Sequence, residues 1–358
     1  YSRGLSLFAL DAIPILENYT GRAYMRLTQR FKTAPVKQGE KKPVISNAYY
    51  NIQADYQKEF QTQKHPKFGT DLFKYYYVGK FNTNYTPFYQ AGVDDTTGLP
   101  AIRMVLDRRP DGVSYERSEL NPELANYTTQ FFNEYGSTPT SLTAILAQNY
   151  LTNGYGPNSV YGRYSNVGTS IGSYSKASVD QFAVGVDASF DFQPGKIRHQ
   201  IEFGLYYQQQ VDRGYGAGNF AGSTNLWQYA RQLSNSHISL DYSNPIFIVG
   251  GQQYTRDQVL AGVVSPSPYD TIIYARQLDT ISTFGQNLRN KLGLKASDYV
   301  DVDNYDPSMY SLDMFSADEL LNAGNPFVGY RGYDYTGKRL KGQVNFNDFF
   351  TKKDANGN

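Results

Sequence analysis

Four aspartates crowd one short segment of the chain and form its densest group of metal-ligand types. They are Asp298, Asp301, Asp303 and Asp306, in the run Asp-Tyr-Val-Asp-Val-Asp-Asn-Tyr-Asp. Carboxylate oxygens are ligands that Ca²⁺ prefers, but the glycine and the terminal glutamate that an EF-hand loop needs are missing here. The sequence therefore leaves two interpretations of this segment, a calcium site and an acidic solvated turn.

Residue types that enzymes use are present, but not in catalytic arrangements. The three histidines, His65, His199 and His237, stand in unrelated contexts, and the chain has no cysteine. No Gly-x-Ser-x-Gly elbow occurs, and the glycine-rich run 214–218 follows a predicted strand without opening a helix, as a phosphate-binding loop would require. Apart from the calcium question, we expect no enzymatic activity, no metal site and no cofactor.

Aromatic side chains point to binding rather than to catalysis. Tyr330, Tyr333 and Tyr335 lie close together in a segment rich in glycine and tyrosine. A tyrosine ring can stack on a sugar or a peptide while its hydroxyl forms a hydrogen bond, although such a segment can equally pack on itself. These three tyrosines are therefore candidates for substrate binding.

The elements that would position such residues begin with a hairpin at residues 179–210. Two segments of alternating polarity meet at the Pro194-Gly195 turn, with Phe182 and Val186 on one face and Asp187 on the other. A period of two indicates strands, and each arm keeps it for about 14 residues, whereas strands usually have about 5 or 6. Tilted by about 40°, such an arm rises about 35 Å, enough to cross the roughly 25 Å apolar band of an outer membrane.

Other segments repeat the alternation less regularly. Residues 22–31, 48–56 and 72–83 are predicted strands, and residues 5–13 are a weaker one that would pair with 22–31. With the hairpin this makes about six strands of an all-β, transmembrane antiparallel β-barrel. Arg26 and Arg30 would face its interior, where they could touch a transported ligand or anchor whatever fills the lumen.

The lengths of the connections assign the two ends of this sheet. Successive strands of such a barrel cross the membrane in opposite directions, so the links between them lie on alternate sides. If the turn at 193–196 is periplasmic, the Lys-rich link 32–46 lies outside the cell and the links near 14–21 and 59–71 lie in the periplasm. Short inner turns and long outer loops are typical of outer-membrane barrels. The predicted organisation is strands with short turns (1–83), a long extracellular loop (84–178), the hairpin (179–210) and a second long extracellular loop with short helices (211–358).

The long loops carry helix signals of their own. Ser316 and Glu319 form a capping box before Leu320 and Leu321. Leucines and aromatics also recur at helical spacing over 284–292, which ends at a glycine, and over 142–150. Because long ordered loops are usually binding elements, we expect function to reside in them.

Composition excludes several classes of protein. The chain has 34 basic and 33 acidic residues, a net charge of +1, so it has no electrostatic signature of a nucleic-acid partner. No apolar run is long enough for a membrane helix. The strands of a barrel alternate apolar and polar residues, so mean hydropathy does not detect them. The 33 tyrosines suit the boundary between membrane and water.

The runs Leu72–Phe81 and Ser311–Leu321 resemble the middle of large TonB-dependent outer-membrane receptors, as do 332–338 and 346–350. The resemblance is to the branch with a carboxypeptidase-regulatory-like N-terminal module and very long outer loops. It implies a barrel of about 22 strands around a plug, placed in the cell outer membrane of a Gram-negative cell. It also implies import of a scarce solute such as a peptide, glycan or metal chelate, with TonB and a surface lipoprotein as partners.

The same resemblance implies that the chain is an excerpt, because the N-terminal module, the TonB box and the closing strands of that family are not in it. Two alternatives stay open. A secreted, carbohydrate-binding β-sandwich would also show alternation, since a half-buried sheet has the same period. A non-transporting outer-membrane adhesin or secretion barrel would show the same strands and loops.

Overall fold

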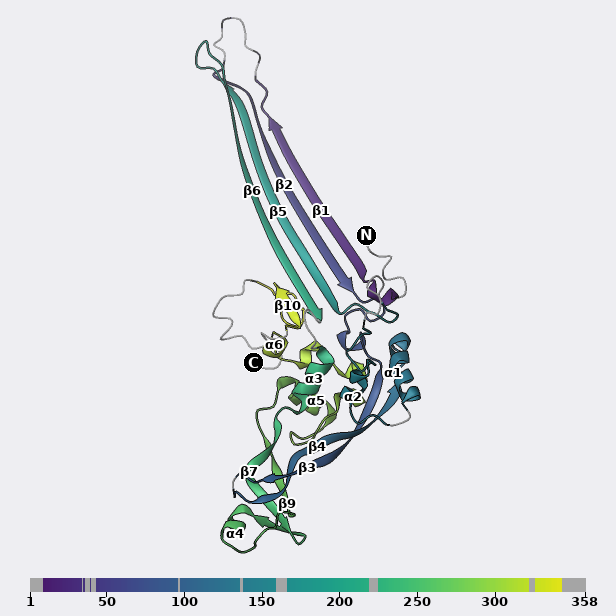
Figure 1. Ribbon diagram of the computed structural model, residues 1–358. Helices are drawn as coiled ribbons and strands as arrows, with labels where there is room; N and C mark the ends of the chain where they lie inside the picture. Colours follow the sequence, from purple (N-terminus) through teal and green to yellow (C-terminus); the bar gives the residue numbers. More distant parts are fainter. Residues whose placement is uncertain are drawn as a thin grey trace.

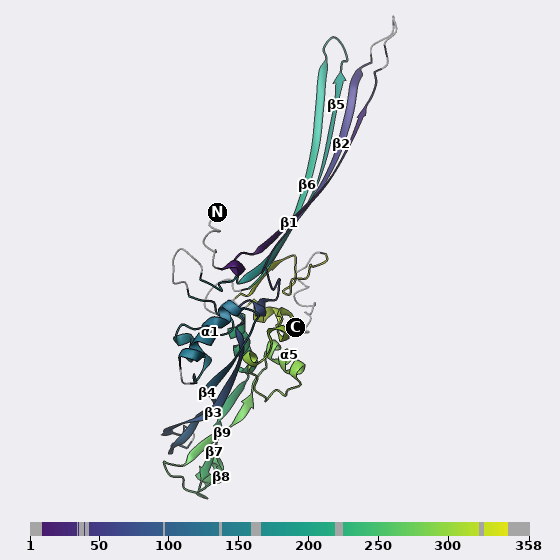
Figure 2. The same cartoon turned by 90° about the vertical axis from the view of Figure 1, so that its right-hand side faces the viewer.

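The computed structural model describes residues 9–33, 35, 39, 43–95, 97–135, 138–158, 166–218, 225–321 and 326–342. A long, narrow sheet projects from one end of the molecule, and a domain of shorter strands, helices and loops lies at its base (Figure 1). Figure 2, turned by 90°, shows the same separation. We call the first the long sheet and the second, made of the described residues within 65–172, 225–327 and 332–342, the base domain.

The long sheet is antiparallel, in the order β1-β2-β5-β6-β10. Its first four strands have 16 to 20 residues each. Its strands are β1 Ile15–Arg30, β2 Ile45–Lys64, β5 Ser173–Phe192, β6 His199–Gly218 and β10 Val328–Arg331. The predicted hairpin is confirmed, because β5 and β6 pair along their whole length, with Val186 opposite Leu205.

The neighbour of the hairpin shows that the predicted parity is wrong. β2 pairs with β5, with Ile52 opposite Val186, although the first part of the base domain separates them in the chain. Arg30, Ile45 and Phe192 therefore all lie at the end of the sheet far from the base domain (Figure 1). The link that leaves Arg30 and the turn that follows Phe192 begin at the same end, and not at opposite ends.

The error comes from residues 72–83, which alternation predicts as a strand of the same sheet. Leu72–Lys74 form the 3-10 helix η3, and strand β3 begins only at Gly79 and pairs with β4. Phe73, Tyr75 and Tyr77 are buried in the base domain. A short buried segment with apolar side chains at every second position has the same period as a strand. Without this segment one strand fewer precedes β5, so the links before β5 lie at the opposite ends of the sheet from those predicted.

The strands at the start of the chain also differ from the prediction. Leu10–Ala12 form the 3-10 helix η2 inside the predicted strand 5–13, whose residues 5–8 lie outside the described residues. Most of the predicted link 14–21 belongs to β1, and the predicted link 59–71 begins inside β2. Among the described residues β1 pairs with β2 alone, and the long sheet has fewer strands than predicted, the first four of them longer.

The base domain contains the second sheet, in the order β3-β4-β9-β7-β8. β4 and β9 are parallel and the other pairs antiparallel. Its strands are β3 Gly79–Val93, β4 Pro100–Arg117, β7 Ile238–Val249, β8 Gln252–Thr255 and β9 Thr271–Leu278. Its helices are α1 Pro122–Glu134, α2 Leu142–Ala147, α3 Leu226–Asn235, α4 Arg256–Leu260, α5 Thr283–Leu292, α6 Ala317–Leu320, and the 3-10 turns η4 Val302–Asn304, η5 Pro307–Met309 and η6 Leu312–Met314.

The three helices that the sequence predicts are confirmed as α2, α5 and α6. α6 has the predicted capping box of Ser316 and Glu319, and α5 ends at Gly293, whose φ is 70°. The Glu319 carboxylate also accepts the backbone N–H groups of Thr283 and Phe284 at 2.7 and 3.2 Å, so one side chain caps two helices. None of the described helices combines the length and the apolar character needed to span a membrane.

Candidate functional site

One face of the long sheet is apolar across four strands. Paired residues of neighbouring antiparallel strands share a face, so the registers define rows across the sheet. Four consecutive rows are Ala23-Tyr56-Phe182-Gln209, Met25-Ala54-Val184-Tyr207, Leu27-Ile52-Val186-Leu205 and Gln29-Tyr50-Ala188-Phe203. The division of the hairpin into two unlike faces, with Val186 on one and Asp187 on the other, is thus confirmed.

The side chains of this apolar face are exposed. Leu205 is 71% exposed and Met25 is 68% exposed, and Phe182 and Phe203 are exposed as well. The β-sandwich alternative requires a second sheet against this face, whereas the second sheet of the described residues lies in the base domain (Figure 2). An apolar surface of this kind marks a site that contacts either a partner or a membrane.

The opposite face is polar and internally hydrogen-bonded. Asn51, only 3% exposed, accepts hydrogen bonds from Arg26 Nε at 2.8 Å and from Thr28 Oγ1 at 3.0 Å. Its amide nitrogen donates to Asp187 Oδ2 at 2.9 Å. Arg26, a candidate for contact with a ligand, is therefore engaged with its own sheet. The long sheet thus exposes its apolar face, and a hydrogen-bonded network holds part of its polar face.

Arg30, the other candidate arginine, lines a hollow of about 370 Å³ on this polar face, at the end far from the base domain. Asn47 Nδ2 donates to Asp191 Oδ2 at 2.6 Å, and Arg198 pairs with the same carboxylate. Two guanidinium groups thus line the hollow with the Asp191 carboxylate. Such a surface can hold an anionic group, but it contains no nucleophile with an adjacent base.

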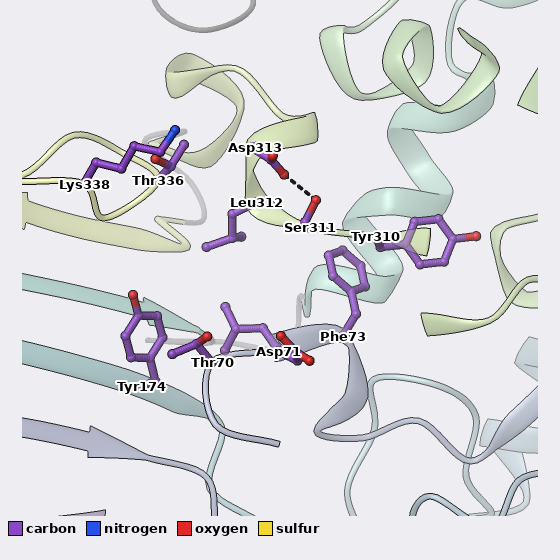
Figure 3. Close-up of a pocket in the computed structure, with 11 residues that line it drawn as sticks. Thr70, Asp71, Phe73, Tyr174, Tyr310, Ser311, Leu312, Asp313, Thr336 and Lys338 are labelled. Carbon is purple, nitrogen blue, oxygen red and sulfur yellow. Dashed lines mark hydrogen bonds between the residues drawn. The ribbon is translucent and has the colours of Figure 1, made fainter. Parts of the chain in front are cut away.

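A pocket of about 270 Å³ lies where the long sheet meets the base domain (Figure 3). Tyr174 of β5 and Phe73 supply apolar walls. The Asp71 carboxylate and the Lys338 side chain lie on different sides of the pocket (Figure 3), and Ser311 donates a hydrogen bond to Asp313 near its rim. Mixed apolar and charged walls can bind a small polar solute by hydrogen bonds.

The sequence did not identify this pocket, although two of its lining runs were noticed for another reason. Leu72–Phe81 and Ser311–Leu321 carry the family resemblance, and residues of both runs line the pocket. Nothing in either run indicates by itself that the two lie together. Tertiary contacts bring them to one place, among them the stacked rings of Phe73 and Phe315.

The three candidate tyrosines have different environments, and for two of them the structure agrees with the second interpretation, in which the segment packs on itself. Tyr333 and Tyr335 are 4% and 5% exposed and belong to the main apolar core. The backbone oxygen of Tyr335 accepts the Tyr215 hydroxyl at 3.0 Å. Only Tyr330, 38% exposed and opposite Tyr215 in the β10–β6 pair, could meet a ligand with its ring. The Gly-Tyr-rich segment packs on the protein itself.

The four aspartates serve separate structural roles. Asp301 pairs with Arg108 at 2.6 Å and Asp303 with Arg231 at 2.6 Å. Burial raises the pKa of the Asp301 carboxyl, and the Arg108 guanidinium opposes that rise. Asp298 accepts the backbone N–H of Lys295, and Asp306 accepts that of Ser308. In the described part of the chain, no group of three acidic or histidine side chains could hold a metal ion.

His65 joins the end of β2 to the base domain. Its Nδ1 accepts the backbone N–H groups of Lys67 and Phe68 at 3.0 and 3.3 Å, which leaves the proton on Nε2 to bond Ser170 Oγ at 2.7 Å. Burial lowers the pKa of His65 to about 4. Desolvation disfavours the charged ring, and protonation of Nδ1 would remove an acceptor from two N–H groups. The neutral side chain thus holds the turn that follows β2 against Ser170 of the base domain.

Comparison with models of known protein families gives no match, and comparison with curated proteins gives none either.

Proposed function

We propose that the long sheet stands in an outer membrane with its apolar face against lipid, and that the chain is part of a TonB-dependent receptor that captures and imports a scarce solute. The observation that carries this proposal is the contrast between the two faces of the long sheet, with exposed apolar rows on one face and hydrogen-bonded amides and carboxylates on the other. Water disfavours such an apolar face, whereas lipid stabilises it.

The dimensions of the apolar rows support a membrane. On β5 they extend from Phe182 to Phe192. At about 3.3 Å per residue this is about 33 Å along the strand, or about 25 Å along the membrane normal for a tilt of about 40°. An outer-membrane protein has an apolar band about 25 Å tall. The remaining residues of β5, from Ser173 to Gln181, would lie between this band and the base domain.

The connections support one orientation. β5 and β6 are joined by the short segment that contains Pro194 and Gly195, at the end far from the base domain. Outer-membrane proteins have short periplasmic turns and long extracellular loops. We therefore place the base domain outside the cell, where its pocket would meet solutes first.

The proposed mechanism makes or breaks no covalent bond. A peptide, glycan or metal chelate would bind the base domain through hydrogen bonds to groups such as Asp71 and Lys338, and apolar parts of the solute would contact Phe73. TonB would supply directionality through parts of the receptor outside these residues. A surface lipoprotein would be a further partner of the base domain.

The membrane placement can be tested with single cysteines, because the chain has none of its own. The full chain carrying Leu205→Cys, labelled with a polarity-sensitive dye, is reconstituted in lipid vesicles that contain a lipid-borne quencher. We expect blue-shifted emission and strong quenching, because Leu205 lies on the apolar face. The matched control is Tyr206→Cys on the polar face. Equal emission and quenching at the two positions would rule out the proposed lipid face.

A further inference from the structure

The apolar face of the long sheet changes character abruptly toward the base domain. The row next to Ala23-Tyr56-Phe182-Gln209 is Gly21-Lys58-Asp180-Val211, and the row after it is Tyr19-Phe60-Ser178-Arg213. Charged groups therefore appear on the same face within two residues of the last apolar row. If the apolar rows lie in lipid, these charges lie at the level of the extracellular headgroups.

Three cations gather around one carboxylate at this level. Asp180 Oδ2 accepts hydrogen bonds from Arg213 Nη1 at 2.6 Å and from Arg339 Nη2 at 3.1 Å. Lys58 is exposed and lies directly across from Asp180 in the β2–β5 register. Three cations and one carboxylate leave a local excess of two positive charges. We call Lys58, Asp180, Arg213 and Arg339 the cationic rim.

The geometry holds part of the cationic rim in place. Arg213 packs beneath Gly332, whose φ is +73°, and a Cβ on that glycine would lie 2.7 Å from Arg213 Cγ. The Tyr56 hydroxyl donates to Asp180 Oδ1 at 3.2 Å, which ties the carboxylate to the last apolar row. The side chain of Arg339 is 47% exposed, so its guanidinium can reach an external anion. The site is thus partly pre-organised and partly open.

We propose that the cationic rim binds the phosphate of a phosphorylated lipid of the outer leaflet, whose acyl chains lie on the apolar rows. Guanidinium groups pair with phosphate in a bidentate manner, and basic residues beside a membrane attract anionic headgroups. The apolar surface beside the rim, including Phe182, Tyr56 and Tyr207, supplies the contact for the chains. This inference rests on the proposed membrane placement of the long sheet.

The charge count favours a lipid over a purely internal role of the cluster. Asp180 alone could hold Arg213 and Arg339 in place, but it leaves the cluster positive and does not bond to Lys58 in the part of the chain that the structure describes. A phosphate above the rim would neutralise that excess. A monoester phosphate carries about −1.5 to −2 charges near neutral pH, so one phosphate group of such a lipid matches this excess.

The test compares lipid retention by the full chain and by the variant Lys58→Gln/Arg339→Gln. Both proteins are reconstituted in neutral phosphatidylcholine vesicles doped with a lipid that carries a monoester phosphate, and the bound phosphorylated lipid is counted by native mass spectrometry. We expect the variant to retain it about 10- to 30-fold more weakly, since each basic residue near a membrane surface contributes several-fold in affinity. Arg213 is left intact because its packing makes its variants prone to misfold.

The matched control is Lys291→Gln/Lys295→Gln, which removes the same charge from the surface of the base domain. Equal retention by the rim variant and this control would overturn the lipid site. Displacement of the lipid by inorganic phosphate at equal concentration would also overturn it, because the site would then recognise a free anion. The emission of the dye on Leu205→Cys is measured in the same vesicles. Strong quenching without retention of the phosphorylated lipid would refute the lipid site and leave the membrane placement intact. Absence of quenching would refute both.

Discussion

The long sheet and the base domain distribute the same residue types in opposite ways. In the base domain Phe315 and Phe284 are fully buried and their rings stack at 4.3 Å, while buried charged groups such as Asp303 and Arg289 pair with an opposite charge or bond to backbone oxygens. In the long sheet Leu205 and Phe203 are exposed, while Asn51 is buried in a hydrogen-bonded network. The base domain thus keeps its large apolar side chains away from water. The long sheet leaves an apolar face exposed, which water disfavours.

In the proposed arrangement the two regions contact different solvents, water for the base domain and lipid for the apolar face of the long sheet. The hydrophobic effect stabilises the base domain by removing its aromatic side chains from water. In lipid the backbone hydrogen bonds of long strands and the internal polar network remain, and exposure of the apolar rows no longer costs free energy. The two regions should therefore respond to substitution independently, each according to the solvent that it contacts.

The largest effect is expected from opening a cavity in the base domain. Phe315→Ala should lower the free energy of unfolding by about 3 to 5 kcal/mol, because it removes a buried ring from the main core. Phe203→Ala on the exposed face is the matched control and should cost less than half as much. Urea unfolding of the full chain in vesicles gives both values. Equal losses would show that Phe203 is packed against protein in the assembled molecule.

A charge on the apolar face should cost slightly less. Val186→Lys is expected to destabilise the chain in vesicles by about 2 to 4 kcal/mol, because Val186 would face lipid near the middle of the membrane. Gly185→Lys, one residue away on the polar face of the same strand, should have a far smaller effect. Folding yield and urea midpoints in vesicles measure the difference. A comparable cost for both would mean that the faces are wrongly assigned.

The smallest effect concerns His65, at the junction of the regions. Its pKa is about 4 in the folded chain and about 6.5 when unfolded, so only the unfolded chain binds this proton between those values. The free energy of unfolding should therefore fall as the pH drops from about 6.5 to about 4, by about 2 to 3 kcal/mol. The His65→Gln variant should lack this part of the pH dependence. Parallel stability curves for the two proteins would contradict a neutral, buried His65.

Local patterns predicted much of the secondary structure. The alternation in 179–210, the capping box at Ser316 and the apolar spacing before Gly293 each depend on neighbouring residues only, and each has its expected element. The same alternation misled at 72–83, because a buried segment with aromatics at every second position has the period of a strand. Period alone does not distinguish these two cases.

The candidate site was less accessible to sequence. Tyr333 and Tyr335 look exposed in a glycine-rich segment, yet they pack against Tyr215 and the rest of the main core. Arg26 bonds to Asn51, which lies on the neighbouring strand and outside any local pattern. These outcomes depend on which distant segment lies alongside, and a single sequence does not encode that choice in its spacing.

The sequence by itself determined the two-faced strands, their great length and the short helices, because side-chain periodicity and caps are properties of adjacent residues. Only the tertiary structure decided that β2 pairs with β5, that residues 72–78 leave the sheet, and that Asp180 gathers Arg213 and Arg339. Such pairings close long loops, and their free energy comes from contacts that exist only once the distant segments have met.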